Sequence, residues 1–133
     1  MGVRQNLRID RYGWDIYIYY TVDEGQKSEI LTRMYEMGCD GKVLTSIRKN
    51  LESSEEDTGF TYTNYSKRCS ILVIHKASSI GEFINTFEHE RNHLEMHICE
   101  ALDINPYSEE AAYMSGDIAQ LILEKALRSI INL

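Results

Sequence analysis

Alternation of apolar and polar residues is clearest between residues 12 and 22. Apolar or aromatic side chains occupy every second position there, namely Tyr12, Trp14, Ile16, Ile18, Tyr20 and Val22. A period of two is typical of a β-strand. The chain later holds a continuous apolar run at residues 71–74, bounded by polar residues. We therefore expect two further strands, at residues 60–63 and 69–75.

Apolar residues spaced by three and four positions predict four helices. They cover about residues 24–38, 43–51, 79–102 and 108 onwards. Ser79, with Glu82 three residues later, matches a capping box, although Ser78 is a second candidate for the cap. Pro106 lies in the break before the last helix, and Ser108 is placed to cap that helix. The predicted order, β-α-α-β-β-α-α, indicates an α+β fold.

Composition limits the classes of protein that the chain can belong to. Its 133 residues are 43% hydrophobic and 26% charged, which is typical of one globular domain spanning residues 1–133. The formal net charge of −7 argues against binding to nucleic acid, since Lys and Arg carry most of that affinity. We therefore expect no nucleic-acid partner.

Three cysteines, Cys39, Cys69 and Cys99, are widely spaced and form no C-x-x-C pair. An odd number of isolated cysteines is typical of buried thiols in a reducing compartment, so we expect a cytoplasmic protein. The first eight residues are not followed by the apolar stretch of a signal peptide. No apolar run approaches 18 residues, so we expect no membrane segment. The sequence does not indicate an oligomeric state.

One motif has the spacing of a metal centre. His89, Glu90 and His93 form H-E-x-x-H within the third predicted helix. Residues four apart lie about 40° and 6 Å from one another on a helix, so both imidazoles can bind one Zn²⁺ ion. Glu90 is rotated about 100° from His89, which suits a general base acting on a water held by the metal. This pattern predicts a hydrolase.

A catalytic zinc ion usually has three protein ligands. His97 continues the series of four, but about 12 Å of helix axis separates it from His89, which is too far for one tetrahedral ion. We therefore expect His97 to lie beside the metal ligands or at the protein surface. Glu109 and Glu110, after Pro106, are the stronger candidates, because the last helix can fold back across the motif helix.

Residues 69–123 resemble the gluzincins, which are zinc peptidases whose third ligand is a Glu on the helix after H-E-x-x-H. Glu109 begins the family pattern E-x-x-A, so the resemblance favours Glu109 over Glu110 as the third ligand. It implies a zincin-like fold, with a sheet of about three strands against the motif helix. It also implies a metallopeptidase that hydrolyses a peptide or protein substrate aligned as an added strand. The layout is also similar to small proteins of gut bacteria and their phages.

Several residues depart from the family pattern. Glu88 and Arg91 are charged where active members usually have uncharged residues, and Arg91 lies at the edge of an apolar stripe. A buried guanidinium there requires an acidic partner, unless that face is partly open. Tyr113 stands where the family has Asp or Asn, and Asp117 follows one turn later. Tyr113 is placed to hydrogen-bond a ligand or the substrate.

These departures leave other functions open. One is a non-catalytic interaction protein, related to phages or mobile elements, with a degenerate or metal-free site. Another is a protease so selective that it cleaves a single regulator. The oxyanion of a tetrahedral intermediate requires a hydrogen-bond donor, for which the chain offers the tyrosines Tyr62, Tyr65, Tyr107 and Tyr113.

Overall fold

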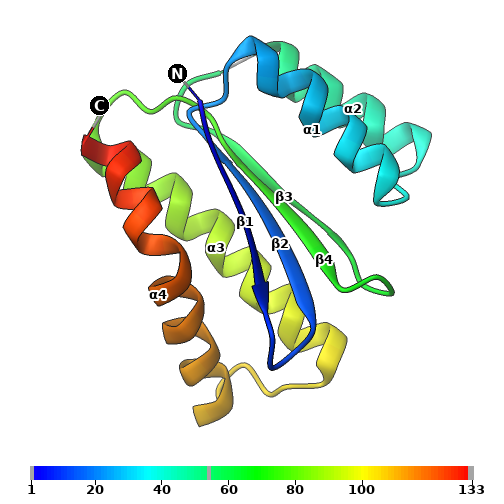
Figure 1. The fold of residues 1–133 in the computed structure, drawn as a ribbon, viewed down its shortest axis with the longest axis vertical. Coiled ribbons are helices and arrows are strands. Elements are labelled where there is room, and N and C mark those ends of the chain that lie inside the picture. Colours follow the sequence, from blue (N-terminus) through cyan, green and yellow to red (C-terminus); the bar gives the residue numbers. More distant parts are fainter. Residues whose placement is uncertain (1, 54, 132–133) are drawn as a thin grey trace.

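The computed structural model of the chain describes residues 2–53 and 55–131. Within these residues the elements follow the order ββααββαα (Figure 1). They are β1 (Val3–Ile9), β2 (Trp14–Tyr20), α1 (Glu24–Glu36), α2 (Gly41–Ser53), β3 (Gly59–Asn64), β4 (Cys69–Ile74), α3 (Ile80–Leu102) and α4 (Glu109–Ile131).

The four strands form one mixed sheet in the order β1-β2-β4-β3. The central pair, β2 and β4, is parallel, and the two outer pairs are antiparallel. Helices α1 and α2 lie on one face of the sheet, and α3 and α4 lie on the other (Figure 1). Helix α3 packs against β3 and β4, while α4 packs against β1. The α+β class expected from the sequence is confirmed.

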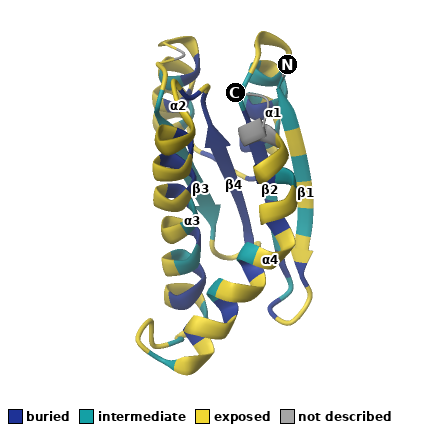
Figure 2. Ribbon diagram, turned by 90° about the vertical axis from the view of Figure 1, so that its left-hand side faces the viewer, coloured by how far each residue is buried: buried dark blue, intermediate teal, exposed yellow. Residues whose placement is uncertain are grey.

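Helices cover both faces of the sheet along its central strands, which explains the aromatic composition of β2. Trp14, Ile16 and Ile18 contribute to the core beneath α3 and α4, whereas Tyr19 contributes to the core beneath α1 and α2. A strand covered on both faces is expected to carry large apolar residues at consecutive positions. Figure 2 shows buried residues along β2 and β4, the two central strands.

Strand β1 was not predicted, so the expected sheet of about three strands is corrected to four. Val3, Leu7 and Ile9 alternate in β1, but Gln5 interrupts the apolar positions. The Gln5 side chain accepts a hydrogen bond from the Tyr20 hydroxyl and donates one to the backbone oxygen of Leu121. A polar residue can occupy this inward position because hydrogen bonds replace its contacts with water.

Helix ends follow the expected chemistry. Asp23, Ser79 and Ser108 each accept a hydrogen bond from the backbone N–H three residues later, as N-cap side chains do. Gly38 adopts a φ of +85° just after α1, where a side chain would be strained. Helix α2 starts at Gly41, two residues before the predicted position.

All three cysteines are free and buried, as expected. Among the residues that the structure describes, none of the helices has both the length and the apolar character needed to cross a membrane.

Candidate metal centre

The motif helix lies close to strand β3 because Gly59 has no side chain. A Cβ atom at Gly59 would overlap the backbone oxygen of Val73 in β4. It would also lie 3.3 Å from Cγ of Glu90 in α3. A glycine here permits a close approach of strand and helix. The edge strand is therefore held directly beside the middle of α3.

Glu90 is buried, with 5% of its surface exposed, and β3 orients its carboxylate. The Thr61 hydroxyl donates a hydrogen bond of 2.8 Å to Oε1 of Glu90. The second oxygen, Oε2, lies 4.0 Å from Nε2 of His89. One carboxylate oxygen is thus fixed by the protein, while the other faces the histidines.

His89 and His93 are exposed, and their rings converge. Their Nε2 atoms lie 3.2 Å apart, and their ring centroids are separated by 4.8 Å. Two nitrogens bound to one tetrahedral zinc ion, each at about 2.0–2.1 Å, are separated by about 3.3 Å. The ligand atoms of His89, Glu90 and His93 all lie within 4.8 Å of one another. The structure therefore brings these three predicted residues together in a geometry that fits zinc.

A groove of about 360 Å³ opens between β3 and this face of α3. We call it the histidine groove, and its lining residues are Gly59, Phe60, Thr61, His89, Glu90, His93 and His97. A second cavity of about 250 Å³ shares Gly59, His89 and Glu90 with it and extends to Asp57 and Asn85. The two cavities are therefore neighbours along the edge strand, and both touch the metal-binding group.

His97 lines the histidine groove but lies outside the group of His89, Glu90 and His93. Its Nδ1 atom is 2.8 Å from the Thr63 hydroxyl of β3. Burial, together with the neighbouring His93, lowers the pKa of His97 below its ordinary value. His97 therefore lies in the groove beside His89 and His93, which is one of the two positions expected for it.

Glu109, predicted as the third ligand, is not brought to the histidines. It is the exposed first residue of α4, and it does not belong to the group of described residues that could hold a metal. The neighbouring Glu110 lies 3.4 Å from both the Tyr12 hydroxyl and the Arg11 guanidinium, in the β1–β2 connection. The start of α4 therefore contacts the β1–β2 connection and not the histidines.

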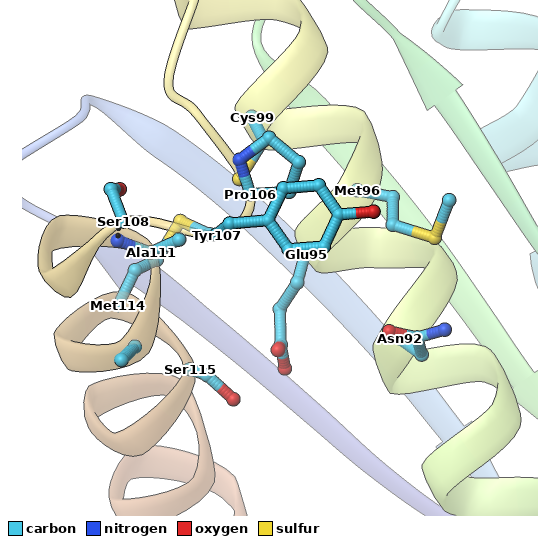
Figure 3. Close-up of a pocket in the computed structure, with 11 residues that line it drawn as sticks. Asn92, Glu95, Met96, Cys99, Pro106, Tyr107, Ser108, Ala111, Met114 and Ser115 are labelled. Atoms are coloured by element: carbon cyan, nitrogen blue, oxygen red, sulfur yellow. Dashed lines mark hydrogen bonds between the residues drawn. The ribbon is translucent and has the colours of Figure 1, made fainter.

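The reason is that α4 packs on the face of α3 that turns away from β3. A cavity of about 300 Å³ between the two helices marks this contact (Figure 3). Its wall on α3 includes Asn92, Glu95, Met96 and Cys99, and its wall on α4 includes Ala111, Met114 and Ser115. Two further residues considered from the sequence, Tyr113 and Asp117, are exposed on α4 and line neither this cavity nor the histidine groove.

Arg91 lies on the side of α3 that packs against α4. The sequence predicted an acidic partner for Arg91, and the structure gives two. Its guanidinium nitrogens lie 2.6 Å from Glu88 and 2.8 Å from Glu95, and one also contacts Ser115 of α4. Burial raises the pKa of Glu95, although Arg91 and Ser115 act in the opposite direction. Arg91 therefore links α3 to α4 and does not line the histidine groove.

Sequence reasoning missed the contribution of β3. Gly59, Thr61 and Thr63 alternate along the strand, and all three contact or approach α3 or its side chains. A strand face made of glycine and threonine is too small and polar for an ordinary core. This alternation in the sequence could have indicated that β3 contributes to the site. Comparisons of the chain with protein-family models, curated proteins and solved structures found no match.

Proposed function

We propose that the protein is a zinc-dependent metallopeptidase, in which His89 and His93 hold the metal and Glu90 is the general base. One observation carries the proposal: two imidazole Nε2 atoms lie 3.2 Å apart beside a buried carboxylate. When bound, zinc supplies a Lewis acid that lowers the pKa of a coordinated water to about 7 and polarises a substrate carbonyl.

Glu90 is suited to proton transfer because, among the described residues, the hydrogen bond given for its carboxylate is to Oε1. The Thr61 hydroxyl holds Oε1, which fixes the plane of the carboxylate. Oε2, on the side of His89, takes the proton from the attacking water and later passes it to the leaving amine. Burial of Glu90 keeps this carboxylate in one position before the substrate arrives.

An extended peptide is the substrate that the surroundings favour. Strand β3 is at the edge of the sheet and pairs on one side with β4. In the part of the chain that the structure describes, no further strand pairs with its other side. The backbone groups of such an edge can bind a peptide as an additional strand. The histidine groove runs beside this edge, which would carry a peptide past Glu90.

The ligand set also supports a second function, a non-catalytic zinc-binding protein. Among the described residues, the metal-binding group contains a single carboxylate, that of Glu90. If Glu90 itself binds the metal, it completes three ligands and is no longer free to act as a base. We also propose a cytoplasmic location, because the free thiols of Cys39, Cys69 and Cys99 suit a reducing compartment.

The test is cleavage of a peptide library prepared from a proteome digest, with new termini identified by mass spectrometry. Zinc-loaded wild-type protein should generate a consistent set of new termini, and a chelator should abolish them. Glu90→Gln should retain zinc and lose cleavage by at least a hundredfold, because the amide cannot accept the proton.

Glu82→Gln is the matched control, since Glu82 is exposed in the first turn of the same helix. It should cleave as the wild type does. Zinc binding without cleavage by the wild type, or equal cleavage by Glu90→Gln, would contradict the peptidase proposal. Loss of zinc binding in Glu90→Gln would favour the non-catalytic site.

A further inference from the structure

A chain of hydrogen bonds connects the core of the sheet to the histidine groove. Nε1 of Trp14 in β2 lies 3.0 Å from the Ser70 hydroxyl in β4. That hydroxyl lies 2.7 Å from the Thr63 hydroxyl in β3. The Thr63 hydroxyl in turn lies 2.8 Å from Nδ1 of His97 in α3. The chain thus crosses three neighbouring strands and ends on an imidazole.

The buried end of this chain fixes its direction. The indole N–H of Trp14 can only donate, so Ser70 accepts from it. Both residues are fully buried. Within the described residues, the Thr63 oxygen is the one acceptor that the structure gives for the Ser70 proton. Leaving a buried hydroxyl proton without an acceptor is costly, so Ser70 donates to Thr63. Among the described residues, Nδ1 of His97 is the one acceptor that the structure gives for the Thr63 proton, so the arrangement in which each hydroxyl proton has an acceptor has Thr63 donating to Nδ1 of His97.

This direction determines the tautomer of His97. A neutral imidazole that accepts at Nδ1 carries its proton on Nε2. Within the described residues, His97 lies outside the group of His89, Glu90 and His93 that could hold the metal, so its Nε2–H is not one that metal binding there would remove. This Nε2–H is a hydrogen-bond donor on a ring that lines the histidine groove with His89 and His93.

We propose that Nε2–H of His97 donates a hydrogen bond to a carbonyl oxygen of the peptide bound in the histidine groove. This proposal rests on the proposed function. A donor held in place before substrate binding stabilises the negative charge that develops on such an oxygen. The ring is also held from a second side, because Tyr65 packs against it with a centroid distance of 5.7 Å. The four tyrosines considered for this role do not line the histidine groove.

The first test reads the tautomer directly and requires neither zinc nor substrate. Nitrogen-15 NMR of the histidine side chains in the metal-free protein should show His97 with its proton on Nε2 at neutral pH. Thr63→Ser retains the donor and should preserve that spectrum. Thr63→Val removes the donor and should produce a mixture of tautomers. A proton on Nδ1 of His97 in the wild type would overturn the proposal.

The second test uses acetohydroxamate as a zinc-binding probe that carries a carbonyl oxygen. We compare wild type, His97→Phe, which has no N–H donor, and His97→Gln, which retains one. Zinc affinity should be equal in all three. Acetohydroxamate should bind His97→Phe about tenfold more weakly, with partial recovery in His97→Gln.

Different results would overturn the proposed function and the proposed role of His97. If zinc does not bind the wild type, the proposed function and the role of His97 are both overturned, whatever the tautomer. If zinc binds equally and acetohydroxamate does not distinguish wild type from His97→Phe, the role of His97 alone is overturned. His75→Gln, which alters a buried histidine outside the groove, should leave both affinities unchanged.

Discussion

In the part of the chain that the structure describes, the Thr61 hydroxyl is the one hydrogen-bond donor given for the Glu90 carboxylate. Thr61 donates to Oε1 from the neighbouring strand, while Oε2 lies on the side of His89, at the histidine groove. Removing the hydrogen-bond donor of a buried carboxylate lowers the free energy of unfolding by roughly 1–3 kcal/mol. Thr61, which orients the proposed general base Glu90, therefore lies outside the H-E-x-x-H motif. Its contribution can be tested by a separate substitution.

Thr61→Val should lower the free energy of unfolding by about 1–3 kcal/mol and reduce cleavage at least tenfold, because Glu90 loses the bond that orients it. Zinc affinity should be unchanged, since Thr61 does not belong to the metal-binding group. Urea denaturation and the peptide-library assay measure these effects. Thr61→Ser keeps the hydroxyl and serves as the control. Normal cleavage by Thr61→Val would show that Glu90 is oriented in some other way.

At the scale of elements, a pair of charges within α3, Arg91 and Glu95, lies against Ser115 of α4 where the two helices meet. Arg91 and Glu95 have side chains that are only 16% and 14% exposed, and they pair at 2.8 Å. Removing one partner of such a pair leaves the other charge buried, at a cost of about 3–5 kcal/mol, whereas replacing both is often neutral.

Arg91→Leu should therefore destabilise the protein by about 3 kcal/mol, and adding Glu95→Leu should recover most of the loss. Zinc affinity should not change in either variant, because this pair lies outside the histidine groove. Arg128→Leu breaks an exposed pair with Glu124 and should cost under about 1 kcal/mol. Equal effects of Arg91→Leu and Arg128→Leu on the denaturation midpoint would contradict this account.

The approach of β3 to α3 gives another prediction at this scale. Gly59→Ala should destabilise the protein by about 1–3 kcal/mol, because the added methyl group meets Val73 and presses on Glu90. Gly116→Ala is a matched control on α4, where an added Cβ contacts nothing within 4 Å. It should stabilise the protein by up to about 1 kcal/mol. Thermal unfolding of the two variants distinguishes these opposite signs.

Local patterns predicted the helices and three of the strands, because capping and periodicity are properties of a few neighbouring residues. Strand β1 was missed because the polar Gln5 interrupts its alternating apolar positions. The groups that hydrogen-bond the Gln5 side chain come from β2 and α4, which are distant in the sequence. His89, Glu90 and His93 are brought together because one helical turn fixes their spacing. The place of Glu109 depends on which face of α3 the last helix covers, and local sequence does not encode that choice.

At the scale of the whole molecule, pH should affect stability through His75. This residue follows β4, is buried, and hydrogen-bonds Asn50 of α2 at 2.8 Å. Burial, and secondarily the charge of Lys27, lower the pKa of His75. The unfolded chain therefore takes up more protons than the folded one below the ordinary imidazole pKa of about 6.5, so the free energy of unfolding falls as pH falls.

We expect the urea midpoint of the metal-free wild type to decrease between pH 7.5 and pH 5.5, with a smaller decrease in His75→Gln. The difference between the two proteins isolates the contribution of His75 from that of other titrating groups. His97, whose pKa is also lowered, contributes in the same direction and should remain as a residual slope in His75→Gln. Identical pH dependence of both proteins would exclude His75 as a source.

On the proposed function, His89 and His93 hold one zinc ion on the exposed face of α3. Equilibrium dialysis against Zn²⁺, followed by metal analysis, measures this binding. The wild type should retain one zinc ion per chain, His93→Ala should lose it, and His75→Ala should retain it. Substoichiometric zinc in the wild type, or equal retention by His93→Ala, would contradict the account.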